Sequence, residues 1–136
     1  MEKNPTLLFV VAAALINDKG EVLVQKRPPG KPMAGLWEFP GGKVEPDEDP
    51  ENALVRELQE ELSISTSRHD FEPLAFASEP LNTKHLLLLL YRCRKWSGHL
   101  ESLESAELLW ISLDQLKNLK MPPADKPLVD RLLELE

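Results

Sequence analysis

Residues 41–64 read GGKVEPDEDPENALVRELQEELSI, a pair of glycines followed by a segment suited to a helix. The adjacent glycines leave no side chain between the backbone and a ligand, and they tolerate positive φ. Asp49 is a favourable helix N-cap, and Pro50 suits the first helical position. No helix-breaking residue follows before Leu62. We therefore expect a glycine turn and a helix over 50–62, with the rest of the chain arranged around them.

One face of the expected helix is apolar, because leucines recur every four residues: Leu54, Leu58 and Leu62. Another face is acidic, because three glutamates stand at i, i+3 and i+4: Glu57, Glu60 and Glu61. Carboxylates this close repel one another, and a hard divalent cation such as Mg²⁺ or Mn²⁺ would accept their oxygens and cancel the repulsion. Taken by itself, the acidic face also fits an ordinary solvated helix surface. Arg56 can hold the carboxylates in place by reaching Glu60 one turn on or Glu48 in the preceding loop.

The spacing of the whole segment favours the metal site over the solvated surface: Gly42, five residues, Glu48, seven residues, Arg56-Glu57-Leu58, one residue, Glu60-Glu61, two residues and Ile64. This pattern over 42–64 resembles the Nudix box of nucleoside-diphosphate-linked hydrolases. Ser63 stands where the family pattern has a glycine, which ends the helix in a left-handed conformation. A serine in that conformation costs about 1 kcal/mol. Because no carboxylate is lost, we expect the catalytic apparatus to be intact.

The resemblance implies an α/β (α+β) Nudix fold over residues 1–136 as a single domain. A mixed, partly antiparallel sheet would lie sandwiched between the box helix and a C-terminal helix. Hydrophobic patterns predict strands at 7–16 and 21–26, paired with each other through a turn at 17–20. Further strands are expected at 71–78, 86–94 and 108–111, and helices at 112–119 and 128–135. The five leucines at 86–90 favour a central position for their strand.

Composition narrows the class of protein. A chain of 136 residues can bury the core of one domain. Its apolar runs are too short to span a bilayer and no signal-peptide pattern is present, so we expect a cytoplasmic protein without membrane association. The single cysteine, Cys93, cannot form an internal disulfide, and its apolar strand predicts a buried thiol. The net charge of −7 argues against stable nucleic-acid binding, but a nucleotide could bind through bridging metal ions. We expect a monomer or a weak homodimer.

Several residues outside the helix are candidates for substrate binding. In MutT-type members of the family an arginine at the place of Arg27 contacts the nucleotide, although a solvated strand-end arginine is equally compatible with the sequence. The run LWEFPGGK at 36–43 is similar to the run ahead of the box in MutT-like hydrolases. It implies a short strand lining the base pocket, with Phe39 either near the substrate or in the core. Lys43 follows the glycines and is placed to meet phosphate oxygens. Lys84 stands at the entrance of the leucine-rich strand and could point into the cleft.

The polar segment 98–107 is expected to supply one more acidic group. In MutT-like relatives a glutamate six residues before a tryptophan serves as a metal ligand or base, and counting back from Trp110 gives Glu104. Glu101 and Glu107 lie close enough in the sequence to remain alternatives. By the same resemblance, the main-chain carbonyl of Gly41 would be a metal ligand beside the box glutamates.

Asp125 has two compatible interpretations. It is a good N-cap for the last helix. It also follows Pro-Pro-Ala, and in MutT-like proteins an Asn or Asp after this tripeptide contacts the base. An ionised carboxylate accepts hydrogen bonds only, so it would favour guanine oxidised at C8, which carries a donor at N7. It could equally accept from the amino group of cytosine.

The resemblance implies an Mg²⁺-dependent attack of water on a nucleoside triphosphate, releasing a nucleoside monophosphate and pyrophosphate. The expected catalytic residues are Glu57, Glu60, Glu61, Arg56 and Glu104, and either Glu57 or Glu104 could take the proton. The leading substrate is 8-oxo-dGTP, whose removal cleans the nucleotide pool and so serves DNA repair and faithful replication. One alternative is CTP or dCTP, and another is a non-catalytic Nudix-fold nucleotide-binding module.

Overall fold

The computed structural model describes residues 6–105 and 107–136. Its strands are β1 (Thr6–Leu15), β2 (Val22–Lys26), β3 (Trp37–Glu38), β4 (Gly41–Lys43), β5 (Glu72–Pro80), β6 (Lys84–Cys93) and β7 (Glu107–Ile111). Its helices are α1 (Pro50–Leu62), the 3₁₀ helix η1 (Arg68–Asp70), α2 (Leu113–Leu116) and α3 (Asp125–Leu135). In the described residues, no helix is long and apolar enough to cross a membrane.

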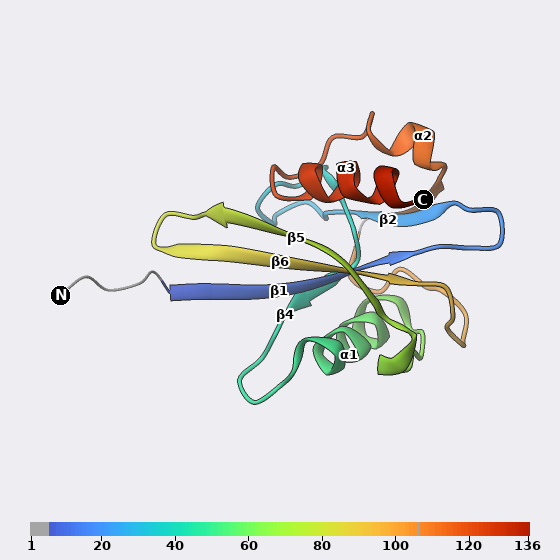
Figure 1. The fold of residues 1–136 in the computed structure, drawn as a ribbon, viewed down its shortest axis with the longest axis horizontal. Helices are drawn as coiled ribbons and strands as arrows, with labels where there is room; N and C mark the ends of the chain where they lie inside the picture. The colour runs from blue at the N-terminus through green and yellow to red at the C-terminus, as the bar shows by residue number, and fades with distance from the viewer. Residues whose placement is uncertain (1–5, 106) are drawn as a thin grey trace.

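The strands form two sheets (Figure 1). The larger one has the order β4-β1-β6-β5, with β1 and β6 parallel from Thr6↔Lys84 to Leu15↔Cys93 and the outer strands antiparallel to their neighbours. The smaller sheet is antiparallel, with the order β3-β2-β7. The interior position of β6 confirms the prediction made from its run of leucines.

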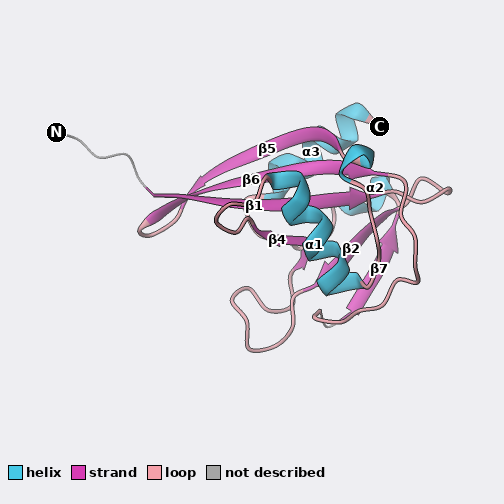
Figure 2. Cartoon of the chain, turned by 90° about the horizontal axis from the view of Figure 1, so that it is seen from below, coloured by secondary structure: helices cyan, strands magenta, loops and turns pink. Residues whose placement is uncertain are grey.

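Helices α1 and α3 cover opposite faces of the larger sheet (Figure 1), and Figure 2 shows α1 crossing in front of its strands. The alternation of β1 assigns its side chains to these faces. Val11, Ala13 and Leu15 pack with the leucines of α1. Ala12, Ala14 and Ile16 pack with α3. The expected mixed sheet between the box helix and the C-terminal helix is therefore confirmed.

The predicted pairing of the first two strands is wrong. Asn17 closes the turn as expected by accepting hydrogen bonds from the backbone N–H groups of Lys19 and Glu21. However, β1 and β2 share only the isolated bridge Ile16↔Val22. Both edges of β1 are already occupied, by β6 on one side and by Pro40 and β4 on the other. Strand β2 therefore leaves this sheet and pairs with β3 and β7.

The ends of α1 follow local capping rules. The Asp49 carboxylate accepts a hydrogen bond from the backbone N–H of Asn52 at 2.8 Å. Ser63 ends the helix at φ +61° and ψ +27°, and its N–H donates to the carbonyl of Gln59 at 3.1 Å. The predicted N-cap is confirmed, and Ser63 does adopt the left-handed conformation that the family glycine would occupy.

The last helix differs from the prediction. It begins at Asp125 rather than at residue 128, because Pro127 falls in the first turn, where its missing N–H breaks no helical hydrogen bond. The N-cap is Ala124, so the predicted capping role of Asp125 is wrong. Helix α2 is shorter than predicted, and Leu119 closes only a turn onto Leu116. Lys84, expected at the entrance of the leucine-rich strand, is the first residue of β6. Cys93 is buried as predicted.

Candidate active site

A cavity of about 970 Å³ opens between the larger sheet, the smaller sheet and the start of α3. This volume lies at the upper end of the range of small-molecule sites. One wall is apolar, because alternate residues of the parallel strands β1 and β6 point into it: Leu8, Val10, Leu86 and Leu88. The lining also includes polar residues: Gln25, Arg27, Glu38, Lys43, Glu61, Glu104 and Asp125. The cavity can thus hold a flat apolar ring system and a charged group at the same time.

The glycines of β4 bring the backbone against α1. A Cβ on Gly42 would lie 2.3 Å from the carboxyl carbon of Glu57, and a Cβ on Gly41 would lie 1.9 Å from the carbonyl oxygen of Val11. Real Cβ atoms essentially never approach other atoms so closely. Gly41 therefore requires glycine for packing and lines the cavity beside Glu61, whereas a side chain at position 42 would meet only the flexible end of Glu57.

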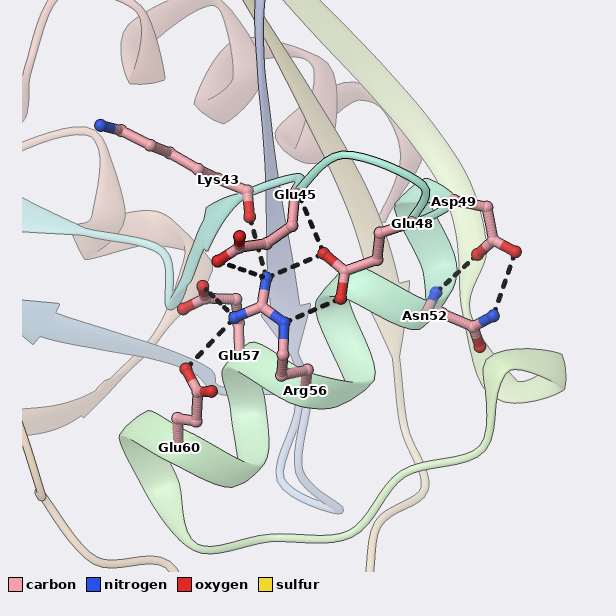
Figure 3. A network of polar contacts seen from close by, with 8 residues as sticks. All are labelled: Lys43, Glu45, Glu48, Asp49, Asn52, Arg56, Glu57 and Glu60. Carbon is pink, nitrogen blue, oxygen red and sulfur yellow. Dashed lines mark hydrogen bonds and ion pairs between the residues drawn. The ribbon is translucent and has the colours of Figure 1, made fainter.

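Arg56 organises the acidic residues on α1 (Figure 3). Its guanidinium donates to both oxygens of Glu48, at 2.8 and 2.9 Å, and to the carbonyl of Lys43 at 3.0 Å. Its Nη1 donates to Glu57 at 2.9 Å and to Glu60 at 3.2 Å. The two contacts proposed from the sequence, to Glu60 and to Glu48, are therefore both present, and they join the loop after β4 to the helix.

Arg56 also fixes the charge of Glu48. Its hydrogen bonds, followed by one from the backbone N–H of Glu45, lower the pKa of Glu48 to about 2. Conversely, the Glu48 carboxylate raises the pKa of Arg56 above its usual value. This ion pair remains charged at any physiological pH. It supports the helix without using the carboxylates that face the cavity.

Glu61 is the buried carboxylate of the helix, and Glu57 beside it is partly buried. Burial, aided by the charge of Glu57, raises the pKa of Glu61 to about 8 despite hydrogen bonds from Gln25 at 2.7 Å and from the Gly41 N–H at 3.4 Å. Burial likewise raises the pKa of Glu57, although Arg56 opposes the shift. Two desolvated, mutually repelling carboxylates offer hard oxygen ligands, so this site fits a divalent cation, which would relieve the repulsion.

The ligand cage is not already assembled. Among the residues that the structure describes, no group of three acidic, histidine or cysteine side chains stands ready to hold a metal ion. In Figure 3, Arg56 contacts both Glu57 and Glu60. Lys43 extends its side chain away from the cluster, whereas its carbonyl takes part in it.

A second buried polar group lies at the start of α3. Arg27 donates from Nη1 to Glu38 at 2.8 Å and from Nε to the carbonyl of Pro32 at 2.7 Å. Asp125 is only 6% exposed. Burial first, and the charge of Glu38 second, raise the pKa of Asp125 to about 7, against the opposing effects of Arg27 and the backbone N–H of Phe39. Near neutral pH this carboxyl group is therefore available both as a donor and as an acceptor.

The structure divides the sequence-predicted residues into two sets. Those that line the cavity are Arg27, Phe39, Gly41, Lys43, Glu61, Glu104 and Asp125. Arg56, Glu57, Glu60 and Lys84 are outside its lining, and Glu57 lies against Gly42. Phe39 is 4% exposed and belongs to the core as well as to the cavity. Of the alternatives to Glu104, Glu101 is not a lining residue and Glu107 forms an ion pair with Lys26 at 3.4 Å.

Two residues of the site were missed in the sequence. Gln25 is buried in β2 and bonded to Glu61, and Glu38 is paired with Arg27. Gln25 directly follows the apolar run Val22–Val24 in the same strand, and Glu38 stands between the aromatic residues Trp37 and Phe39. A polar residue inside an apolar strand was the signal for both, since burial of such a group requires a partner.

Comparison with known proteins gives consistent matches. A family model described as NUDIX domain matches residues 6–132. CTP pyrophosphohydrolase of Escherichia coli strain K12 is 37% identical over 128 residues, covering 94% of this chain and 93% of the relative. 8-oxo-dGTP diphosphatase of the same strain is 33% identical over 129 residues, covering 94% and 98%. The solution structure of the E. coli ORF135 protein aligns with a TM-score of 0.87 at 36% identity, over 96% of this chain and 91% of that chain.

The fold, the carboxylate-bearing helix and these matches define the class of protein as a hydrolase of phosphorus-containing anhydrides, more narrowly a pyrophosphohydrolase. The chain belongs to the NUDIX family. The resemblance read from the box at 42–64 is thereby confirmed. Because the two relatives are named for different bases, cytosine and 8-oxoguanine, family membership alone does not choose between these substrates.

Proposed function

We propose that this chain hydrolyses nucleoside triphosphates to a nucleoside monophosphate and pyrophosphate, with Mg²⁺ as the metal, Mn²⁺ as a substitute, and 8-oxo-dGTP as the preferred substrate. The observation that carries this proposal is the cavity, whose lining includes both Glu61 of the acidic helix and the buried Asp125. A triphosphate at the carboxylate end leaves the base beside Asp125. Removal of 8-oxo-dGTP would make the protein a sanitiser of the nucleotide pool.

The metal end supplies the chemistry of hydrolysis. A divalent cation held by the carbonyl of Gly41 and by Glu57, Glu60, Glu61 and Glu104 would polarise phosphate oxygens and lower the pKa of an attacking water. Glu57 or Glu104 would accept the proton of that water. Lys43 extends freely and would neutralise charge on the phosphates. Arg56 orients the carboxylates through the contacts it already makes.

The base end supplies selectivity. Asp125 faces the cavity with a pKa near neutrality, so it can accept from the N7–H of an oxidised guanine in its ionised form. Intact guanine would present a lone pair at the same position. Arg27 is held by Glu38 and Pro32, which favours a role in shaping the base pocket over a role at the phosphates. The apolar wall of β1 and β6 suits a bicyclic purine.

CTP and dCTP form the second candidate substrate class. The relative at 37% identity is a CTP pyrophosphohydrolase, and the amino group of cytosine can donate to Asp125. A non-catalytic nucleotide-binding module is the third candidate. Retention of every carboxylate of the 42–64 pattern speaks against it.

The test is a pyrophosphate-release assay with Mg²⁺ against 8-oxo-dGTP, dGTP, CTP, dCTP and 5-methyl-dCTP. We expect the highest kcat/KM for 8-oxo-dGTP, with a monophosphate as the nucleoside product. If kcat/KM were highest for CTP or dCTP, the preferred substrate would be a cytosine nucleotide and not 8-oxo-dGTP. If the protein bound nucleotides but released no pyrophosphate from any of them, it would be a non-catalytic nucleotide-binding module.

A further inference from the structure

Gln25 is a buried polar residue that neither the family pattern nor the proposed chemistry uses. It is 5% exposed and follows three buried apolar residues of β2, Val22, Leu23 and Val24. Burial of an amide is unfavourable unless its groups are hydrogen-bonded. The Nε2 of Gln25 donates to the Oε2 of Glu61 at 2.7 Å, although the two residues are 36 positions apart. The amide therefore has a defined partner, and that partner is a carboxylate of the candidate metal site.

The contact controls the orientation of Glu61. The other donor to this carboxylate, the Gly41 N–H, reaches the same Oε2 atom but at 3.4 Å, so Gln25 makes the shorter bond. Both donors reach Oε2, and the carboxyl group of Glu57 lies beside Glu61. Because Glu61 lies on α1 and Gln25 on β2, the hydrogen bond joins the helix to the smaller sheet. Both residues line the cavity.

The other end of the amide points to a ligand. The Oε1 of Gln25 is buried and has no hydrogen-bond partner within the described part of the chain. Gln25 also lines the cavity. A buried acceptor without a partner is costly and uncommon, and it indicates a donor that arrives from outside the protein. A water molecule carried by a hydrated divalent cation is such a donor, because Mg²⁺ usually keeps several of its waters.

We propose that Gln25 is a positioning residue that orients Glu61 toward the divalent cation and accepts a hydrogen bond from the water that accompanies it. This inference rests on the proposed function, since it assumes a cation at the carboxylates of α1. Partners that orient metal ligands typically matter by about 10-fold to 100-fold in metal affinity or activity. Gln25 acts through Glu61, so its effect should vanish when Glu61 can no longer ligate.

The primary measurement is the affinity for Mn²⁺, obtained from the electron paramagnetic resonance signal of the free ion without nucleotide. Gln25→Met keeps the length and volume of the side chain but removes both polar atoms. We expect Mn²⁺ affinity to fall by about 10-fold or more in this variant. Gln25→Leu serves as a second variant with the same loss of hydrogen bonds. Far-UV circular dichroism and urea unfolding establish that each variant is folded.

Two comparisons separate positioning from a general structural role. Val24→Ala, a buried neighbour on β2 outside the cavity lining, should lower stability and leave Mn²⁺ affinity unchanged. In a double-mutant cycle, Gln25→Met should add no further loss of affinity in a Glu61→Gln background. In the hydrolysis assay at saturating metal, kcat should fall while KM for the nucleotide stays within about twofold.

The outcomes distinguish this inference from the proposed function. Wild-type hydrolysis with unchanged Mn²⁺ affinity in both Gln25 variants overturns the positioning role and leaves the function standing. A loss that adds fully to that of Glu61→Gln, or an equal loss in Val24→Ala, also overturns it. Weakened Mn²⁺ binding in a protein that hydrolyses none of the nucleotides supports the positioning role while the function fails. Absence of Mn²⁺ binding in the wild type removes both.

Discussion

At the scale of single residues, a substitution at Glu57 should lower the rate of hydrolysis without abolishing nucleotide binding. Its carboxylate lies against Gly42 and accepts from Arg56 at 2.9 Å, so the amide of Glu57→Gln occupies the same space without the charge. We expect kcat to fall by about 100-fold or more, because a metal ligand or base is lost. Nucleotide affinity from isothermal titration calorimetry should change far less. Glu51→Gln, on the Tyr91 side of the same helix, is the matched control and should keep the wild-type rate; an equally active Glu57→Gln would contradict the assignment.

Asp125 makes stability depend on pH. Its pKa rises from 3.8 to about 7 on folding, chiefly through burial, so the folded chain holds a proton that the unfolded chain has released. The stability that this carboxyl group contributes is therefore present below its pKa in the unfolded chain, and it is lost as the pH rises toward its pKa in the folded chain. Asp125→Asn should therefore gain free energy of unfolding relative to the wild type as the pH rises from about 4 to about 8. Urea unfolding in EDTA measures this, and a constant difference at all pH values would exclude it.

Residue-scale predictions succeeded where a side chain acts on its own neighbourhood in the chain. Asp49 as N-cap, Ser63 as left-handed C-cap and Arg56 as a bridge to Glu60 depend on contacts within a few positions. Gln25 and Glu38 depend on contacts 36 and 11 residues away, respectively. Such contacts follow from the packing of separate elements, and the sequence indicated only that a buried polar group needs some partner.

At the scale of elements, the end of α1 carries removable strain. Ser63 has φ +61° and ψ +27°, a conformation that glycine adopts at no steric cost. Ser63→Gly should raise the free energy of unfolding by about 0.5–1 kcal/mol, with the gain reduced by the greater freedom of glycine in the unfolded chain. Ser65→Gly is the control, since Ser65 is extended and bridged to Ser97. Chemical denaturation should show a gain for the first and a loss for the second; a loss in both would argue against strain at Ser63.

The glycines of β4 give a contrast between activity and stability. In Gly42→Ala the new methyl meets the flexible end of Glu57 at 2.3 Å, which can move aside. We expect a folded protein with at least about 10-fold lower kcat, because the displaced carboxylate belongs to the proposed metal site. In Gly41→Ala the methyl meets the Val11 carbonyl at 1.9 Å, and backbone in a sheet cannot move aside. This variant should lose about 3 kcal/mol or more. Thermal unfolding and the pyrophosphate assay distinguish the two, and equal stability losses would refute the contrast.

The sequence predicted the positions of helices and strands better than it predicted which strands pair with each other. Local patterns predicted β1, β5, β6 and the helix α1, and each was found close to its expected position. The glycine turn expected at 41–42 was wrong, because both glycines belong to strand β4. The partner of β2 could not be read in this way, because it depends on which edges of β1 are free. Those edges are taken by β6, which is 78 residues ahead in register, and by Pro40 and β4. A turn at 17–20 was correctly predicted, but a turn does not guarantee a hairpin.

At the scale of the whole molecule, the two faces of the larger sheet differ in what covers them. The face under α1 is packed with leucines and presents the carboxylates at its edge. The face under α3 opens into the cavity where the helix begins, and residues of β1 and β4 line this cavity together with Asp125. Nothing in the composition indicated this arrangement. It follows from the parallel pairing of β1 with β6, which aligns alternate apolar side chains along one wall.

Metal binding should therefore stabilise the entire fold, and more strongly at higher pH. A ligand that binds only the folded chain adds about 2.7 kcal/mol when its concentration is 100 times its Kd. The cation needs deprotonated ligands, and Glu61 has a pKa of about 8, so Mg²⁺ must displace its proton at lower pH. We expect Mg²⁺ to raise Tm relative to EDTA, with a larger increase at about pH 8 than at about pH 6. In differential scanning fluorimetry, Glu61→Gln should remove most of the increase, whereas Glu51→Gln should retain it. An increase that is independent of pH, or that survives in Glu61→Gln, would show that the ion binds elsewhere on the molecule.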